Sequence, residues 1–307
     1  MIPELNQLVL AIPVFNAEEY LAATLASLNA QGLALRWWLQ DGASTDRTME
    51  IARSFAREGD TVNSEPDGGQ TDAINRAVRQ MGGEIIGFIN GDDLLSPGCA
   101  TRVLEYFRTH PDIDLVYGQV EWIDRDGNPS GIHSGRIGSL TEMLDIYNVW
   151  WRKRQWVQPE VFFRRSLWEK VNGFDTRWNL AFDYDFWVRC IIAGARTAHI
   201  PEVLARFRIH PAQKSSAMEK VADEIRAIVL RHLDARAPIG FWKRFTLRAH
   251  VSYDIYQLGK NTPSGRAPLP FFRALISRPQ WLLCHPVRKR IQAALARLVG
   301  FERHRQT

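Results

Sequence analysis

The chain contains 307 residues, of which 45% are hydrophobic and 24% charged, as in ordinary globular proteins, so a disordered or fibrous chain is excluded. Its three cysteines, Cys99, Cys190 and Cys284, are widely separated and form no CxxC pair. This argues against a disulfide framework or a zinc site and fits a reducing compartment. No apolar run reaches the roughly 18 residues of a membrane span, and the first residues lack the basic region of a signal peptide.

The first half of the chain alternates between strand-like and helical patterns. Apolar runs predict strands at 8–15, 35–40, 61–65 and 84–90. Each run is followed by helical spacing, at 17–32, 41–58, 70–83 and 97–110. Four strand–helix units in succession predict a parallel, doubly wound α/β sheet.

The pattern changes after about residue 140. Segment 148–163 is rich in tryptophan and basic residues, segment 183–195 has helical spacing, and the chain beyond 217 is helical with a break at 263–270. We therefore predict two parts: an α/β domain at 1–216, and a helical, basic C-terminal extension at 217–307.

Acidic residues recur where the predicted strands end. Asp41 closes the second strand, Glu65 and Asp67 follow the third, and Asp92 and Asp93 follow the fourth. Because the carboxyl ends of parallel strands meet at one edge of the sheet, these carboxylates should share a crevice. Any one of them taken alone is more often a helix cap or turn residue. Together they suit a hard divalent cation that holds a substrate phosphate.

The first predicted strand is followed by neither GxGxxG nor the P-loop pattern GxxxxGK[ST]. The segment "PVFNAEE" stands there instead, in which Pro13 removes a backbone donor and Asn16 is suited to cap the helix. The sequence therefore disfavours a dehydrogenase.

Seven short motifs occur in order: "IPVFNAEEYLAATLASLNAQ", "QDGASTDRT", "SEPDGGQTDAINRA", "GGEIIGFINGDD", "GFD", "DYDFW" and "RIH". This ordered set resembles the inverting glycosyltransferases of family 2 from about residue 8 to residue 216. The resemblance implies the GT-A fold, a Rossmann-like, mostly parallel mixed sheet flanked by helices. It also implies a nucleotide-sugar donor and a divalent cation, Mn²⁺ or Mg²⁺.

The resemblance assigns roles to individual residues. Asp41 matches the acid that contacts the nucleotide base. The residues that would shape the base and ribose pocket are Pro13, Phe15, Asn16 and Glu18. The residues that would lie near the ribose, the donor sugar and its diphosphate are Asp67, Gly68, Asp72 and Asp92. Asp93 matches the direct metal ligand, and His210 resembles the late histidine that completes the metal–diphosphate site.

Asp183 in "FDYDFW" matches the catalytic base of the family. The usual motif has Glu directly before this Asp, whereas Phe182 stands there, so Asp185 is an alternative base. We favour Asp183, because the start of the predicted helix can face the cleft. The base would deprotonate an acceptor hydroxyl, which displaces the nucleoside diphosphate in one inverting step. The altered motif is also compatible with a catalytically inactive sugar-nucleotide-binding or scaffold protein.

The segment "VWWRKRQWVQPE" interleaves Trp150, Trp151 and Trp156 with three basic residues. Aromatic faces stack on sugar rings and cations bind phosphate, which indicates an acceptor site. Packing of these tryptophans in the core is the alternative. The same mixture suits single-stranded nucleic acid, but the acidic donor site makes that partner unlikely.

The C-terminal region carries most of the positive charge. Residues 226–307 contain sixteen Lys and Arg but three Asp and Glu, whereas the whole chain has a net charge of +5. A predicted helical face is apolar, formed by Val287, Ile291, Leu295, Leu298 and Val299. This pattern predicts a cytoplasmic protein held at the inner face of the cytoplasmic membrane, with a glycan or lipid-linked acceptor. A helix packed on its own domain, or a nucleic-acid-binding tail, are the alternatives.

Overall fold

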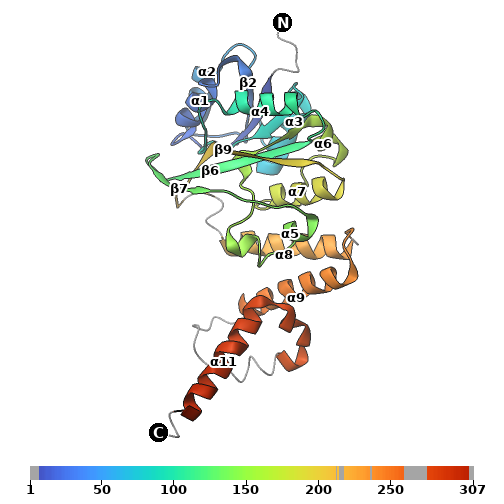
Figure 1. Cartoon of the computed structure of the whole chain (residues 1–307). Helices are drawn as coiled ribbons and strands as arrows, with labels where there is room; N and C mark the ends of the chain where they lie inside the picture. Colours follow the sequence, from blue (N-terminus) through green and yellow to red (C-terminus); the bar gives the residue numbers. More distant parts are fainter. Residues whose placement is uncertain (1–6, 212, 214–217, 236, 259–274, 304–307) are drawn as a thin grey trace.

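A computed structural model of the protein describes residues 7–211, 213, 218–235, 237–258 and 275–303. A nine-stranded sheet forms its centre, in the order β3-β2-β1-β4-β8-β6-β9-β5, with β7 paired to β6 (Figure 1). The strands are β1 (Leu8–Val14), β2 (Leu35–Asp41), β3 (Thr61–Ser64), β4 (Ile85–Phe88), β5 (Leu94–Leu95), β6 (Leu115–Ile123), β7 (Pro129–His133), β8 (Val161–Arg164) and β9 (Thr197–Arg208).

The first half of the chain forms the predicted strand–helix units. Strands β1 to β4 are mutually parallel, with β1 between β2 and β4. The helices of this half are α1 (Leu21–Asn29), α2 (Thr48–Phe55), α3 (Gln70–Gln80) and α4 (Cys99–Thr109), with the short helix η2 (Gly32–Ala34). The predicted α/β class and the predicted mixed sheet are confirmed.

The second half completes the sheet with strands of mixed direction. Strand β8 lies antiparallel between β4 and β6, whereas β6 and β9 are parallel. The short strand β5, directly after the two adjacent aspartates, pairs antiparallel with β9. The helices of this half, most of them short, are α5 (Leu140–Met143), η3 (Trp150–Arg152), η4 (Gln158–Glu160), α6 (Arg165–Lys170) and α7 (Phe182–Ile192).

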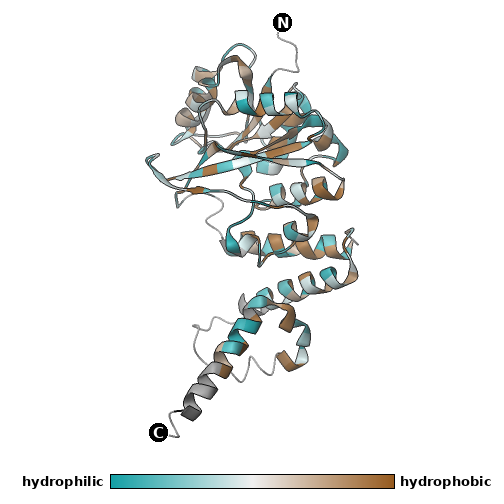
Figure 2. Ribbon diagram, viewed as in Figure 1, coloured by the Kyte–Doolittle hydropathy of each residue, from teal (hydrophilic) through white to brown (hydrophobic). Residues whose placement is uncertain are grey.

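Both faces of the sheet are covered, because alternate residues of each central strand point to opposite sides. In β1, Val9 and Ala11 join the cluster that contains α3 and α7, whereas Leu8 and Leu10 join the cluster that contains α1 and α4. Every residue of β1 and β4 is buried, which explains the continuous apolar runs of their sequences. Figure 2 shows hydrophobic, brown ribbon segments within the sheet, in the upper part of the molecule.

The C-terminal helices are α8 (Met218–Asp234), α9 (Phe241–Leu258), η6 (Pro279–Leu283) and α11 (His285–Arg303). Ile225, Ile228 and Val229 of α8 belong to the same buried cluster as α7. The predicted boundary between residues 216 and 217 therefore does not coincide with a break in the packing. None of the described helices is long and apolar enough to cross a bilayer.

Helix α11 packs through part of its predicted apolar face. Val287 is buried in a small cluster with Tyr253 of α9 and Trp281 of η6, and Ile291 is partly buried against it. Leu295 is exposed. The side chains of Leu298 and Val299 lie outside the described residues. The first two residues of this face, Val287 and Ile291, thus pack on the protein itself, as the packed-helix alternative predicted.

Candidate active site

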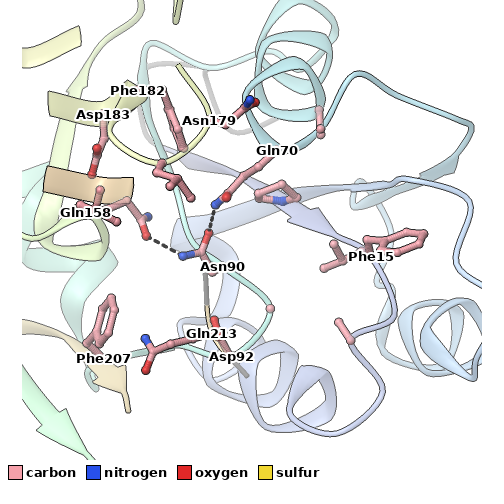
Figure 3. Close-up of a pocket in the computed structure, with 18 of the residues that line it drawn as sticks. Phe15, Gln70, Asn90, Asp92, Gln158, Asn179, Phe182, Asp183, Phe207 and Gln213 are labelled. Carbon is pink, nitrogen blue, oxygen red and sulfur yellow. Dashed lines mark hydrogen bonds between the residues drawn. The ribbon is translucent and has the colours of Figure 1, made fainter. Parts of the chain in front are cut away.

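A cavity of about 760 Å³ opens where β1 and β4 end. This is the edge of the sheet at which the sequence predicted a crevice. Most of its wall comes from residues within five segments, 13–20, 67–73, 90–92, 155–158 and 179–183, and further wall residues include Gly42, Trp150, His210 and Val221. Figure 3 shows Phe15 and Asp183 on opposite sides of this cavity, with Asn90 between them.

Asp92 and His210 form a pair on the cavity wall. The Nε2 atom of His210 lies 3.0 Å from Oδ2 of Asp92, and both residues line the cavity. The imidazole ring is held by Tyr20, whose ring centroid is 4.8 Å away. Tyr20 in turn lies under the guanidinium of Arg208, at 4.7 Å. The ring of Tyr20, itself packed against the guanidinium of Arg208, therefore holds the imidazole of this pair in place.

Asp93 does not line the cavity, although the sequence predicted it as the metal ligand. Its side chain is buried, and Oδ1 accepts a hydrogen bond of 3.0 Å from the backbone N–H of Arg208. Oδ2 is buried and has no hydrogen-bond partner among the described residues. Burial, together with repulsion from Asp92, raises the pKa of Asp93 well above its usual range. The antiparallel pairing of β5 with β9 turns this side chain inward.

The residues of this wall fit a divalent cation. A carboxylate oxygen and an imidazole nitrogen are both ligands that Mn²⁺ accepts. Among the described residues no group of three or more His, Cys, Asp or Glu side chains is arranged to hold a metal. Asp92 and His210 would therefore bind a cation together with oxygens of a phosphorylated ligand, as Mg²⁺ and Mn²⁺ sites in transferases commonly require.

The two candidate bases separate on the first turn of α7. Asp183 lines the cavity and is half-buried there. Desolvation raises its pKa to about 7. Asp185 is buried on the other side of the helix, where it binds Nε of Arg189 at 2.7 Å and Nε2 of His232 at 3.0 Å. Burial acts to raise the pKa of Asp185, but these bonds outweigh burial and hold the pKa below its usual value. Only the first aspartate is in position to meet a ligand.

The predicted base-binding residues divide between the cavity and its supporting loop. Pro13, Phe15 and Asn16 line the cavity, and the ring of Phe15 is 65% exposed at its rim. Glu18 instead accepts the backbone N–H of Arg47 at 3.0 Å. The amide oxygen of Asn16 accepts the backbone N–H of Thr45 at 3.0 Å. These bonds tie the loop after β1 to the loop after β2.

Asp41 is fully buried beneath the same region and is not part of the cavity wall. Its carboxylate accepts hydrogen bonds from the backbone N–H of Ser44 at 3.0 Å and from the hydroxyl of Ser64 at 2.6 Å. The hydroxyl of Ser44 is also bound to it. In this structure Asp41 thus orders the loop that carries Gly42, which does line the cavity.

The segment after β3, which the resemblance assigned to donor binding, also divides between residues that line the cavity and residues that support them. Asp67 lines the cavity, and its Oδ1 accepts the backbone N–H of Gly69 at 2.8 Å. Asp72 accepts the backbone N–H of Gly68 at 3.0 Å and forms an ion pair of 2.7 Å with Arg76. Gly68 and Asp72 therefore shape the turn that presents Asp67.

A chain of three amides crosses the cavity floor, and the sequence analysis missed it (Figure 3). Gln70 donates to Oδ1 of Asn90 at 2.6 Å, and Asn90 donates to Oε1 of Gln158 at 3.2 Å. Gln158 donates to the backbone carbonyl of Phe88. The position of Asn90, two residues before Asp92, was the available signal. Asparagine and glutamine side chains occur in many surroundings and did not by themselves indicate a ligand site, whereas the recurring acids at strand ends did.

The tryptophan-rich segment contributes to both the core and the cavity. Trp156 is 1% exposed and stacks on Tyr117 at 4.6 Å, which matches the core-packing alternative. Trp150 is partly buried, with its ring 4.8 Å from that of Tyr184. Both tryptophans reach the cavity wall. The side chain of Trp151 lies outside the described residues.

An open α/β sheet with a carboxylate–imidazole pair and a separate aspartate on one cavity at its carboxyl edge is an arrangement that suits a transferase acting on a phosphorylated ligand. The family model described as glycosyl transferase family 2 matches residues 9–176, more than half of the chain. The protein belongs to glycosyltransferase family 2.

Curated relatives agree with this family. A PGL/p-HBAD biosynthesis glycosyltransferase of Mycobacterium bovis is 32% identical over 184 residues, which cover 58% of this chain and 67% of the relative. The O-antigen biosynthesis protein RfbC of Myxococcus xanthus is 25% identical over 85% of this chain, but only 20% of that protein is covered.

Solved structures share the fold at low identity. TarS of S. aureus (residues 1–349, in complex with UDP-GlcNAc) has a TM-score of 0.61 at 16% identity, covering 80% of this chain and 71% of that one. The mannosyltransferase PcManGT of Pyrobaculum calidifontis (in complex with GDP-Man and Mn²⁺) has a TM-score of 0.55 at 18% identity, covering 92% and 82%.

Proposed function

We propose that this glycosyltransferase moves a sugar from a nucleoside-diphosphate sugar to an acceptor hydroxyl with inversion at the anomeric carbon. The observation that carries this proposal is the order of groups along one cavity. An exposed aromatic ring, Phe15, stands at one side and Asp183 at the other (Figure 3). The Asp92–His210 pair lines the wall of the same cavity.

This order suits a single displacement. The nucleoside base would stack on Phe15, and the diphosphate would lie at Asp92 and His210. A bound divalent cation would supply charge neutralisation to the departing diphosphate. Asp183 would accept the proton of the acceptor hydroxyl as that oxygen attacks the anomeric carbon from the opposite face. With a pKa of about 7, Asp183 is poised to act as a base near neutral pH.

The same observations favour an active enzyme over an inactive binding protein. Phe182 replaces the usual glutamate, but it is buried among aromatic rings and does not displace the aspartate that follows it. Asp183 still lines the cavity. A scaffold protein has no need of a desolvated carboxylate at that position.

Donor binding is the direct test. We expect a nucleoside-diphosphate sugar with Mn²⁺ to raise the thermal midpoint by several degrees, since a ligand at about 100 times its Kd stabilises the folded state by about 2.7 kcal/mol. UDP-GlcNAc and GDP-Man are the first probes, because structural neighbours were solved with them. Free sugars and Mn²⁺ alone serve as controls. If no member of a full nucleotide-sugar panel shifts the midpoint, the donor proposal is wrong.

For the acceptor, we propose a glycan or lipid-linked glycan of a surface polysaccharide or glycoconjugate. The named relatives act in PGL/p-HBAD and O-antigen biosynthesis, which supports this class. We further propose a cytoplasmic enzyme attached peripherally to an anionic membrane surface.

The start of α9 provides a better membrane contact than α11. Phe241 and Trp242 are 71% and 75% exposed, with ring centroids 5.4 Å apart, and Lys243 beside them is exposed. Exposed aromatic and basic residues on one helix are typical of contact with a lipid headgroup layer. Removing the tail would instead uncover the Tyr253–Trp281 cluster, so substitutions test the proposal more cleanly than truncation.

We expect Phe241→Ser with Trp242→Ser to reduce co-sedimentation with vesicles of 30% anionic lipid severalfold at low salt. The matched control is Leu33→Ser with Ile132→Ser, which removes two side chains of similar exposure elsewhere. Binding by the intact chain should fall with added salt, because basic residues contribute on the order of 1 kcal/mol each near such a surface. Equal sedimentation of both double variants would contradict this contact.

A further inference from the structure

The segment that carries Asp183 into the cavity has no regular secondary structure of its own. Asn179, Leu180 and Ala181 line the cavity and lead directly into α7, whose second residue is Asp183. The backbone N–H groups of residues 179–181 precede the helix, so the helix itself contains no acceptor for them. The direction in which the chain enters α7, and with it the position of Asp183, therefore depends on an acceptor from elsewhere.

Glu224 of α8 supplies that acceptor. Its Oε1 accepts the backbone N–H of Asn179 at 3.2 Å, and its Oε2 accepts those of Leu180 and Ala181, both at 2.9 Å. Three consecutive N–H groups thus converge on one carboxylate. A negative charge at the start of α7 is also favoured by the helix dipole. Val221, three residues earlier on α8, lines the same cavity.

The other end of the segment is anchored separately. Asn75 of α3 binds both the backbone N–H and the carbonyl of Phe174, at 3.0 and 2.8 Å. The hydroxyl of Thr71 donates to the carbonyl of Trp178 at 2.9 Å. These bonds hold the segment up to residue 178. Glu224 is the contact that fixes the three residues directly before the catalytic helix.

We propose that Glu224 is a positioning residue for transfer: from α8, it fixes segment 179–181 and thereby holds Asp183 against the cavity. This inference rests on the proposed role of Asp183 as the base. It assigns part of the active site to the region that the sequence had placed in a separate extension.

The charge of Glu224 gives the proposal a second consequence. Burial is the main cause of the raised pKa of Asp183, and repulsion from Glu224 adds to it. Several other charged side chains near α7 or the cavity have ion-pair partners of their own. These pairs are Asp185 with Arg189 and His232, Asp145 with His250, Asp175 with Arg177 and Arg231, and Asp92 with His210.

We expect Glu224→Gln to move the acidic limb of the pH–activity profile to lower pH, by on the order of half a pH unit. The amide oxygen is able to keep the two bonds to Leu180 and Ala181, whereas the bond to Asn179 is lost, because an amide nitrogen does not accept. The charge that disfavours ionised Asp183 is gone, so the base loses its proton at lower pH. We expect Glu224→Ala to lower kcat about 10- to 100-fold as well, because the segment loses all three bonds. Donor KM should change less than kcat.

The control is Glu219→Gln on the exposed face of the same helix, which should change neither quantity. Titration of ¹³C-labelled aspartate carboxyls by NMR, with Asp183→Asn to assign the resonance, follows the base without any turnover. A shifted Asp183 titration in Glu224→Gln supports the contact even if no donor is ever turned over. An unchanged titration and an unchanged kcat in folded Glu224→Ala would overturn the proposal.

Discussion

Asp183→Asn is expected to lower kcat on the order of 10²- to 10⁴-fold, the usual contribution of a positioned general base, while donor affinity stays within a few-fold. The change is nearly isosteric, and it removes the negative charge and with it the capacity to accept a proton. Asp183 lies at the side of the cavity away from Phe15, where it would meet the acceptor rather than the nucleotide (Figure 3). Initial rates and donor binding, measured on the same preparation, test both halves of this expectation.

The pH dependence gives an independent check on the same residue. Burial raises the pKa of Asp183 to about 7, so the protonated, inactive form dominates below that pH. For the wild type, kcat/KM should therefore fall about tenfold for each pH unit below 7. The residual activity of Asp183→Asn should lack this limb. A variant that keeps both the rate and the limb would assign the base to another residue.

Asp185→Asn is the informative control, because it removes a carboxylate only two residues away. Asp185 is fully buried and paired with Arg189 and His232, so its loss leaves the guanidinium of Arg189 without its main partner. We expect this variant to lose about 3–5 kcal/mol of folding stability. Any loss of activity should follow the folded fraction. Asp183→Asn should be at least as stable as the wild type at neutral pH, because it removes a carboxyl whose ionised form is disfavoured by burial.

Continuous burial made the first half of the fold predictable. The run at 8–15 became β1, Leu8–Val14, because each of its residues is enclosed by helices on both faces. Strand β8 was not predicted as a partner of β4. Its antiparallel place between β4 and β6 depends on contacts between segments more than 40 residues apart, which local periodicity does not record.

The same limit applied to the site. Two adjacent aspartates predicted a cation, and the resemblance assigned the metal to Asp93, whereas Asp92 is the one that lines the cavity. Which aspartate faces the cavity depends on β9, whose Arg208 backbone binds Asp93 and turns it inward. Glu224 likewise meets segment 179–181 across more than 40 residues. Asp67 and Asp92, which follow strand ends, were found, whereas Glu224, whose role follows from distant packing, was not.

Asp92→Ala is expected to abolish the binding of Mn²⁺ together with a nucleoside diphosphate. We expect kcat/KM to fall at least a hundredfold as a result. Two groups of the protein, the Asp92 carboxylate and the His210 imidazole, face the cavity within 3.0 Å of each other. Of these two protein ligands, Asp92 is the anionic one, so its loss should prevent the cation from binding. Charge on the leaving diphosphate is then no longer offset. We expect His210→Ala to weaken Mn²⁺ binding less, about 10- to 100-fold.

Asp93→Asn separates this assignment from the one that the sequence favoured. The amide oxygen of Asn is able to keep the bond to the Arg208 backbone, and the second carboxyl oxygen has no hydrogen-bond partner among the described residues to lose. We therefore expect Mn²⁺ affinity within a few-fold of wild type. Electron paramagnetic resonance titration of Mn²⁺ with UDP or GDP present measures the affinity without turnover. If Asp93→Asn loses the cation and Asp92→Ala keeps it, the buried aspartate must turn into the cavity when the donor binds.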